Sequence, residues 1–164
     1  MAEPVARYLP DNAATSRLGA ALARAVLDAA PPRLVIYLDG ELGAGKTALT
    51  RAVLAGLGHT GRVPSPTYTL VEPYLLNAFR VFHIDLYRLR DPAELDDLGL
   101  VDELGPGSLL LAEWPSRGDG RLPPADLVCR LEFEGEGRRV LLTSLTGEGA
   151  RVLVQLDQIL PARC

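Results

Sequence analysis

Residues 40–47 read GELGAGKT and match the phosphate-binding pattern G-x-x-x-x-G-K-[ST] in full. An apolar run, LVIYL at 34–38, stands before the motif, and a stretch with helical spacing follows it to about residue 57. A continuous apolar run of this kind is typical of a strand buried on both faces of a parallel sheet. The order of strand, glycine-rich loop and helix therefore predicts an α/β domain built around a P-loop.

The motif also predicts a chemistry. Its glycines let backbone N–H groups turn toward phosphate oxygens, and the positive end of the helix dipole lies at the same place. Lys46 is expected to reach the β- and γ-phosphates, and the Thr47 hydroxyl to bind Mg²⁺. Lys46 is the single lysine among 17 basic residues, as expected where a compact point charge is required. ATP and Mg²⁺ are thus the predicted cofactors, and the residues expected around the phosphates are Glu41, Leu42, Gly43, Ala44, Gly45, Lys46, Thr47 and Ala48. The alternative is a glycine-rich turn that binds nothing.

A P-loop site needs an acidic residue at the end of a second buried strand, where it holds or orients the magnesium. Glu113 follows the apolar run at 108–112, and Asp85 lies between the apolar residues Ile84 and Leu86. We expect both carboxylates to be catalytic together with Lys46, and Glu113 to be the metal ligand beside Thr47. Asp85 is otherwise a solvent-facing charge.

The sequence offers four further residues for the site. Ser65 and Thr67 belong to a proline-rich loop after the P-loop helix, where switch-like segments occur, so their hydroxyls are expected to face the γ-phosphate or its metal. The alternative for this loop is a proline-stiffened turn. Trp114 directly follows Glu113 and is either ordinary core or a lid over the site. His83 has an apolar neighbour on each side, which favours a buried structural histidine over a general base.

The rest of the chain fits one domain spanning residues 1–164. A first strand at 5–9 and a helix from 12 to about 30 precede the P-loop strand. Beyond the P-loop helix, the pattern predicts a strand pair at 67–72 and 80–87 and a helix at 92–104. The last third predicts a β meander of three strands, at 127–133, 140–145 and 151–156. The predicted fold is therefore a mixed, mainly parallel sheet flanked by helices, with a C-terminal β-rich extension.

Composition narrows the class of protein. The chain has a net charge of −4, whereas a protein that binds nucleic acid by itself usually carries a basic face or stripe. The two cysteines, Cys129 and Cys164, have no metal-binding spacing, and neither a signal peptide nor a membrane span is visible, so a cytoplasmic protein is expected. No N-K-x-D motif is present to recognise guanine, which argues against a GTPase. A small-molecule kinase and a nucleotide-sensing protein that hardly turns over stay open.

Four motifs in this order give a more specific indication. GELGAGKT is followed by SPTYTLVEPY at 65–74, HIDLYRL at 83–89 and AEWP at 112–115. Together they resemble the TsaE (YjeE) family over the region from near the N-terminus to about residue 124. The resemblance implies an ATPase required for the N6-threonylcarbamoyladenosine modification of bacterial tRNA.

By the same resemblance, the partners are the TsaB and TsaD proteins, and tRNA is met only through their complex. ATP hydrolysis would be slow in isolation and would reset the complex between turnovers, and the chain would not itself transfer the threonylcarbamoyl group. The family's phosphate and metal residues fall on Lys46, Thr47 and Glu113, and its essential aspartate on Asp85. Ala48 departs from the family, because many members carry a second threonine there. A hydrogen bond from that hydroxyl to the α-phosphate would be lost.

Overall fold

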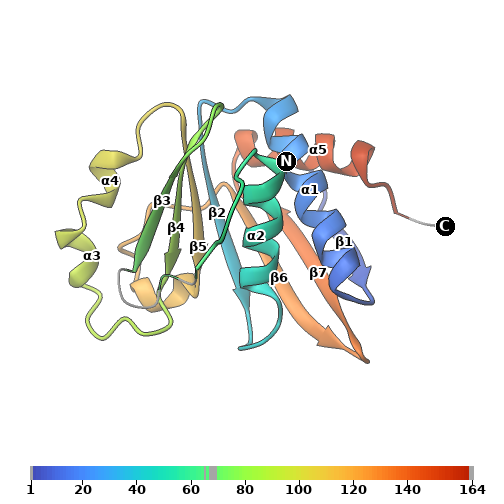
Figure 1. Ribbon diagram of the computed structural model, residues 1–164, viewed down its shortest axis with the longest axis horizontal. Coiled ribbons are helices and arrows are strands. Elements are labelled where there is room, and N and C mark those ends of the chain that lie inside the picture. The colour runs from blue at the N-terminus through green and yellow to red at the C-terminus, as the bar shows by residue number, and fades with distance from the viewer. Residues whose placement is uncertain (1, 65, 67–69, 163–164) are drawn as a thin grey trace.

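The structure is a computed structural model that describes residues 2–64, 66 and 70–162. Figure 1 shows a twisted sheet with helices packed against it. The strands are β1 (Val5–Leu9), β2 (Arg33–Gly40), β3 (Val71–Leu75), β4 (Arg80–Asp85), β5 (Ser108–Glu113), β6 (Leu127–Glu134) and β7 (Gly137–Ser144). The helices are α1 (Asn12–Ala29), α2 (Lys46–Gly56), α3 (Glu94–Asp97), α4 (Leu100–Glu103) and α5 (Gly147–Ile159), with a 3₁₀ turn, η1 (Pro115–Gly118).

The seven strands described form one sheet in the order β1-β7-β6-β2-β5-β4-β3. The four central strands, β6, β2, β5 and β4, run parallel to one another. The outer pairings, β3 with β4, β7 with β6 and β1 with β7, are antiparallel. The predicted mixed, mainly parallel sheet with flanking helices is therefore confirmed.

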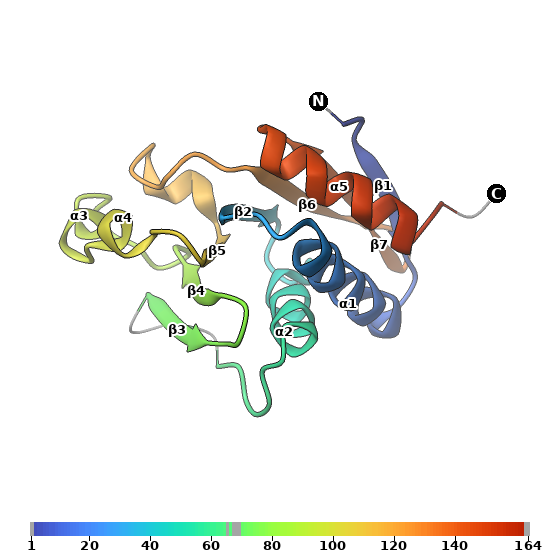
Figure 2. The same cartoon turned by 90° about the horizontal axis from the view of Figure 1, so that it is seen from above.

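Alternating side chains of the central strands supply two apolar cores. On β2, Leu34, Ile36 and Leu38 point to one face, where they join buried residues of α1, α2 and α5. Val35 points to the other face, where it joins a smaller core that includes Leu95 from α3 and Leu100 from α4. Figure 2 shows α1, α2 and α5 apart from the α3–α4 segment. Burial on both faces explains the continuous apolar runs of β2 and β5.

The predicted strand at 151–156 is wrong, because this segment lies within helix α5. Thr146 caps the helix through a hydrogen bond from the backbone N–H of Gly149 to its side chain, at 3.2 Å. Val152, Leu153 and Leu156 are buried together, and this spacing fits one face of a helix rather than an alternating strand. The third strand of the meander comes instead from the N-terminus, because β1 pairs with β7.

Two other boundaries differ from the prediction. The helix predicted at 92–104 is broken into α3 and α4, which are separated by Leu98 and Gly99. Gly99 has a φ of +63°, a left-handed conformation that interrupts a right-handed helix. The predicted strand at 67–72 begins at Val71 and continues to Leu75, and residues 67–69 lie outside the described part of the chain. No helix of the described residues is long and apolar enough to cross a membrane.

Candidate nucleotide-binding site

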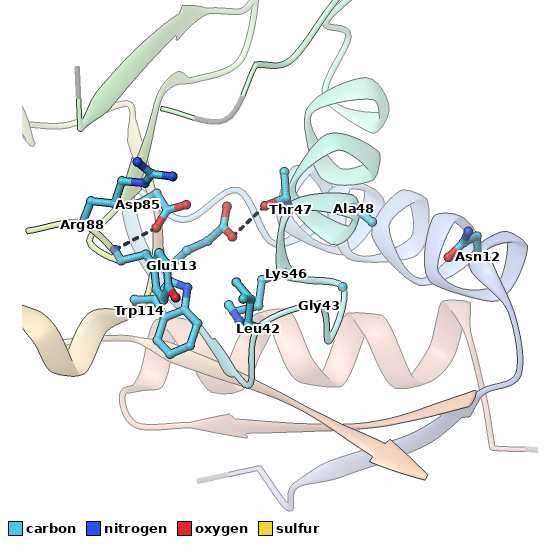
Figure 3. Close-up of a pocket in the computed structure, with 12 residues that line it drawn as sticks. Asn12, Leu42, Gly43, Lys46, Thr47, Ala48, Asp85, Arg88, Glu113 and Trp114 are labelled. Carbon is cyan, nitrogen blue, oxygen red and sulfur yellow. Dashed lines mark hydrogen bonds between the residues drawn. The ribbon is translucent and has the colours of Figure 1, made fainter. Parts of the chain in front are cut away.

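The sheet topology brings the predicted site residues to one edge. The P-loop follows the carboxyl end of β2, and Glu113 ends the neighbouring parallel strand β5. Asp85 ends β4 and is the register partner of Glu113. Parallel strands end at the same edge of a sheet, and ligands of open α/β folds bind there. Figure 3 shows the loop, Asp85 and Glu113 around one cavity.

The loop holds its shape through glycines in the left-handed region of backbone space. Gly40, Gly43 and Gly45 have φ values of +148°, +81° and +106°. At Gly40 a Cβ atom would also lie 2.5 Å from the Leu131 carbonyl oxygen, so a larger residue would force the loop away from β6. Gly45 immediately precedes α2 and ends the loop at the helix N-terminus. The predicted order of strand, glycine-rich loop and helix is therefore present.

Lys46 is folded back over the loop. Its side chain is buried, with 4 % of its surface exposed. Its Nζ donates hydrogen bonds to the carbonyl oxygens of Gly40 at 2.5 Å and Glu41 at 2.9 Å, and lies 4.2 Å from the centre of the Trp114 ring. Burial lowers the pKa of Lys46, and the nearby carboxylates of Glu113 and Asp85 oppose that change. The ammonium therefore has polar contacts within the loop that a phosphate could replace.

Thr47 and Glu113 are already in contact. The Thr47 hydroxyl donates a hydrogen bond to Glu113 Oε1 at 2.9 Å, across 66 residues of sequence. The second carboxylate oxygen of Glu113, Oε2, lies 2.5 Å from His83 Nε2. Glu113 is only 2 % exposed and His83 is fully buried. The carboxylate is thus held on both sides within the end of the sheet.

Asp85 is half-buried beside this pair. Its Oδ1 accepts a hydrogen bond from the backbone N–H of Tyr87 at 3.0 Å. Burial is the main cause that raises the pKa of Asp85, and the Glu113 carboxylate adds to the increase. Figure 3 shows its side chain next to Glu113 and facing the cavity, which Asp85 lines.

Trp114 contributes one wall of the site. Its φ of +56° is a left-handed conformation that costs a non-glycine residue roughly 1–2 kcal/mol. The ring is half-buried, packs 4.9 Å from the Tyr87 ring, and has Lys46 Nζ over its face. The Arg117 guanidinium lies 5.4 Å from the same ring. Trp114 therefore covers the lysine while its other contacts join it to the smaller core.

The cavity has a volume of about 660 Å³. Most of the predicted residues line it, but Ala44 is fully buried and Glu41 lines a separate hollow next to β6. Tyr87 and Arg88 also line the cavity, and their signal in the sequence is their place in the HIDLYRL motif. The residues around the cavity are Asn12, Leu42, Gly43, Gly45, Lys46, Thr47, Ala48, Asp85, Tyr87, Arg88, Glu113 and Trp114. Ser65 and Thr67 lie outside the described residues.

The residues present fit a magnesium–nucleotide complex. A hydroxyl and a carboxylate are oxygen ligands, which Mg²⁺ prefers, and Mg²⁺ usually takes only one or two carboxylates together with substrate phosphates and waters. Within the described ranges no group of three or more His, Cys, Asp or Glu side chains is arranged to hold a metal ion by itself. Thr47 and Glu113 would therefore hold the ion jointly with a nucleotide.

Comparison with known proteins gives a consistent result. The family model described as "Threonylcarbamoyl adenosine biosynthesis protein TsaE" matches residues 9–141. The chain is 40 % identical over 152 residues to the tRNA threonylcarbamoyladenosine biosynthesis protein TsaE of Haemophilus influenzae, covering 92 % of this chain and 96 % of that protein. It is 33 % identical over 135 residues to the Bacillus subtilis protein of the same name, covering 82 % and 84 % of the two chains.

A solved structure supports the fold. The crystal structure of Bacillus subtilis YdiB superposes with a TM-score of 0.76, and the match covers 96 % of this chain and 97 % of that one. The two sequences are 23 % identical in this alignment. The arrangement of strands and helices is therefore shared across nearly the full length of both chains.

Proposed function

This chain belongs to the TsaE family of threonylcarbamoyl adenosine biosynthesis proteins, and on that basis we propose that it binds and hydrolyses Mg²⁺–ATP in support of that tRNA modification. The hydrolysis acts on the TsaB–TsaD complex and resets it between turnovers, while the transfer of the threonylcarbamoyl group takes place elsewhere. tRNA is met only through that complex. We further propose that the protein works in the cytoplasm.

The observation that carries the proposal is the contact between the P-loop and β5. Lys46 and Thr47 are neighbours in the P-loop, Glu113 lies 66 residues after Thr47, and all three line one cavity. Phosphoryl transfer needs little covalent chemistry from a protein, so positioning and charge stabilisation supply most of the catalysis. Lys46 supplies a cation for the phosphates. Beside it, the oxygens of Thr47 and Glu113 form a pair that suits Mg²⁺.

Each residue has a separate role in the binding and hydrolysis of ATP. The Lys46 ammonium exchanges the carbonyls of Gly40 and Glu41 for phosphate oxygens. The loop N–H groups and the first turn of α2 bind the phosphate chain. Asp85, which shares the cavity with Thr47, orients the attacking water. When bound, Mg²⁺ neutralises the charge that develops on the phosphates.

The lining of the cavity favours slow ATP hydrolysis by the chain without its partners. Arg88 is the one arginine among the described residues that line it, and Arg88 is exposed to solvent. A missing arginine finger can lower the rate of phosphoryl transfer by about 10³–10⁵-fold. We therefore propose that the TsaB–TsaD complex either supplies a charge or brings Ser65 and Thr67, which lie outside the described residues, to the phosphate, so that ATP is hydrolysed only in the assembled state.

Phosphate release measured across a titration of the TsaB–TsaD complex tests this function. We expect a low rate for the chain alone and an increase that saturates as the partner binds. A flat rate at saturation, with binding confirmed separately, would contradict partner activation and favour a nucleotide sensor. Transfer of phosphate to a small acceptor by the chain alone would favour a kinase.

A further inference from the structure

His83 has an unusual setting for a charged or polar side chain. It lies in β4 between Phe82 and Ile84 and is fully buried. Its register partner on β5 is Leu111, two residues before Glu113. Leu111 and Glu113 point to the same face of the sheet, so the imidazole lies diagonally across from the Glu113 carboxylate, within reach of its Oε2 atom.

The hydrogen bonds of this histidine are few. In the part of the chain that the structure describes, Nε2 has one partner, Glu113 Oε2 at 2.5 Å, and the buried Nδ1 has none. Burying a polar nitrogen without a partner lowers stability, and a leucine of similar size would avoid that cost. Packing alone therefore does not explain an imidazole here, whereas its bond to Glu113 does.

The two carboxylate oxygens of Glu113 contact different residues. Oε2 faces His83 and Oε1 faces the Thr47 hydroxyl at 2.9 Å. With a proton on Nε2, the imidazole donates to the carboxylate and restrains its rotation about the terminal bond of the side chain. Oε1 is then left facing the phosphate side of the cavity, where Thr47 presents its own oxygen.

We propose that His83 is a positioning residue for the metal site, which holds Glu113 so that Oε1 and the Thr47 oxygen are ready for the Mg²⁺ of a bound nucleotide. The inference rests on the proposed function, because it assumes that this pair receives Mg²⁺. Such outer residues tune metal sites through the ligand that they orient, and their loss typically costs about 10–100-fold in metal affinity.

The test compares His83→Leu with His83→Gln. Leucine keeps the bulk without a donor, whereas the glutamine amide places an N–H near the position of Nε2. The affinity for a non-hydrolysable ATP analogue is measured by calorimetry in Mg²⁺ and in EDTA. We expect His83→Leu to raise the Mg²⁺ concentration needed for half-maximal tight binding by about 10–100-fold. His83→Gln should stay within about threefold of the unmodified chain, and the affinity in EDTA should be the same for all three.

Val81→Ala is the matched control, because Val81 is a fully buried residue of the same strand with no role at Glu113. It should lower the melting temperature without changing the Mg²⁺ dependence. If His83→Leu does not fold, His83→Asn replaces it, since the shorter amide cannot reach Glu113.

Unchanged Mg²⁺ dependence in the folded variant that lacks the donor would overturn the positioning role. Equal losses in Mg²⁺ and in EDTA would also overturn it, because they indicate a structural effect. If the unmodified chain itself shows no Mg²⁺-dependent binding, the proposed function fails, which this design distinguishes from failure of the inference alone.

Discussion

Thr47 Oγ1 donates a hydrogen bond to Glu113 Oε1 at 2.9 Å, although 66 residues separate the two in sequence. The contact joins the first turn of α2 to the end of β5. It forms because β2 and β5 are adjacent parallel strands, so the loop after β2 passes over the carboxyl end of β5. The two predicted metal residues therefore lie side by side at the edge of the sheet.

Glu113→Gln is predicted to weaken the Mg²⁺-dependent part of nucleotide binding by roughly tenfold or more, since it removes a charged ligand but keeps the side-chain shape. Binding in EDTA should be unchanged. Calorimetric titrations at several Mg²⁺ concentrations measure both quantities. Glu148→Gln is the matched control, because Glu148 pairs with Arg151 on the exposed side of α5. Equal Mg²⁺ dependence for Glu113→Gln and the unmodified chain would make Asp85 the better metal ligand.

Lys46→Ala is predicted to weaken ATP binding by roughly 10–100-fold, which corresponds to the loss of a charged hydrogen bond of about 1.5–3 kcal/mol. Hydrolysis should fall below detection while the fold persists, as judged by circular dichroism. Arg24→Ala removes the same charge from an exposed position of α1, far from the cavity, and should leave binding intact. Normal hydrolysis by folded Lys46→Ala protein would refute the phosphate site.

Asp85→Asn is predicted to raise stability and abolish hydrolysis together. Burial raises the pKa of Asp85 above its ordinary value of 3.8, so the ionised carboxylate destabilises the fold at neutral pH. In the unmodified chain this destabilisation develops as the pH rises through the raised pKa and Asp85 loses its proton. The asparagine of the variant is neutral at every pH. The variant should therefore melt at a higher temperature than the unmodified chain at neutral pH and show no gain at pH 3. Thermal melts at the two pH values check this, and a lower melting temperature at neutral pH would contradict it.

Trp114 is the single tryptophan of the sequence, so its fluorescence reports on the site directly. Lys46 Nζ lies 4.2 Å from its ring centre, and binding of a phosphate is predicted to draw the ammonium away. ATP should therefore change the emission along a curve that follows binding, and Lys46→Met should remove that change. Saturating binding by calorimetry without any change in emission would show that the lysine keeps its place.

The central fold could be predicted from sequence because its signals are local and strong. The apolar run at 34–38 and the glycine-rich motif after it identify β2, the P-loop and α2 directly. The segment at 151–156 was missed because the preceding TGEG looks like a turn, whereas Thr146 in fact caps a helix. The pairing of β1 with β7 joins residues 5–9 to residues 138–142, and no local pattern records such a long-range contact.

The site was predictable for residues whose chemistry is unusual in their setting. A lysine in a P-loop and a carboxylate at the end of a buried strand are such cases, and Lys46, Asp85 and Glu113 do line one cavity. The partnership of His83 with Glu113 was not predictable, because it depends on the register between β4 and β5. Burial of a histidine looks the same in sequence whether it fills space or holds a neighbour.

The most direct test of the account is equilibrium binding of ATP to the unmodified chain, measured by calorimetry with Mg²⁺ and with EDTA. We expect one nucleotide per chain, bound more tightly when Mg²⁺ is present. No detectable binding by the folded protein at ATP concentrations up to about 1 mM, where even a weak interaction of about −4 kcal/mol would register, would contradict it.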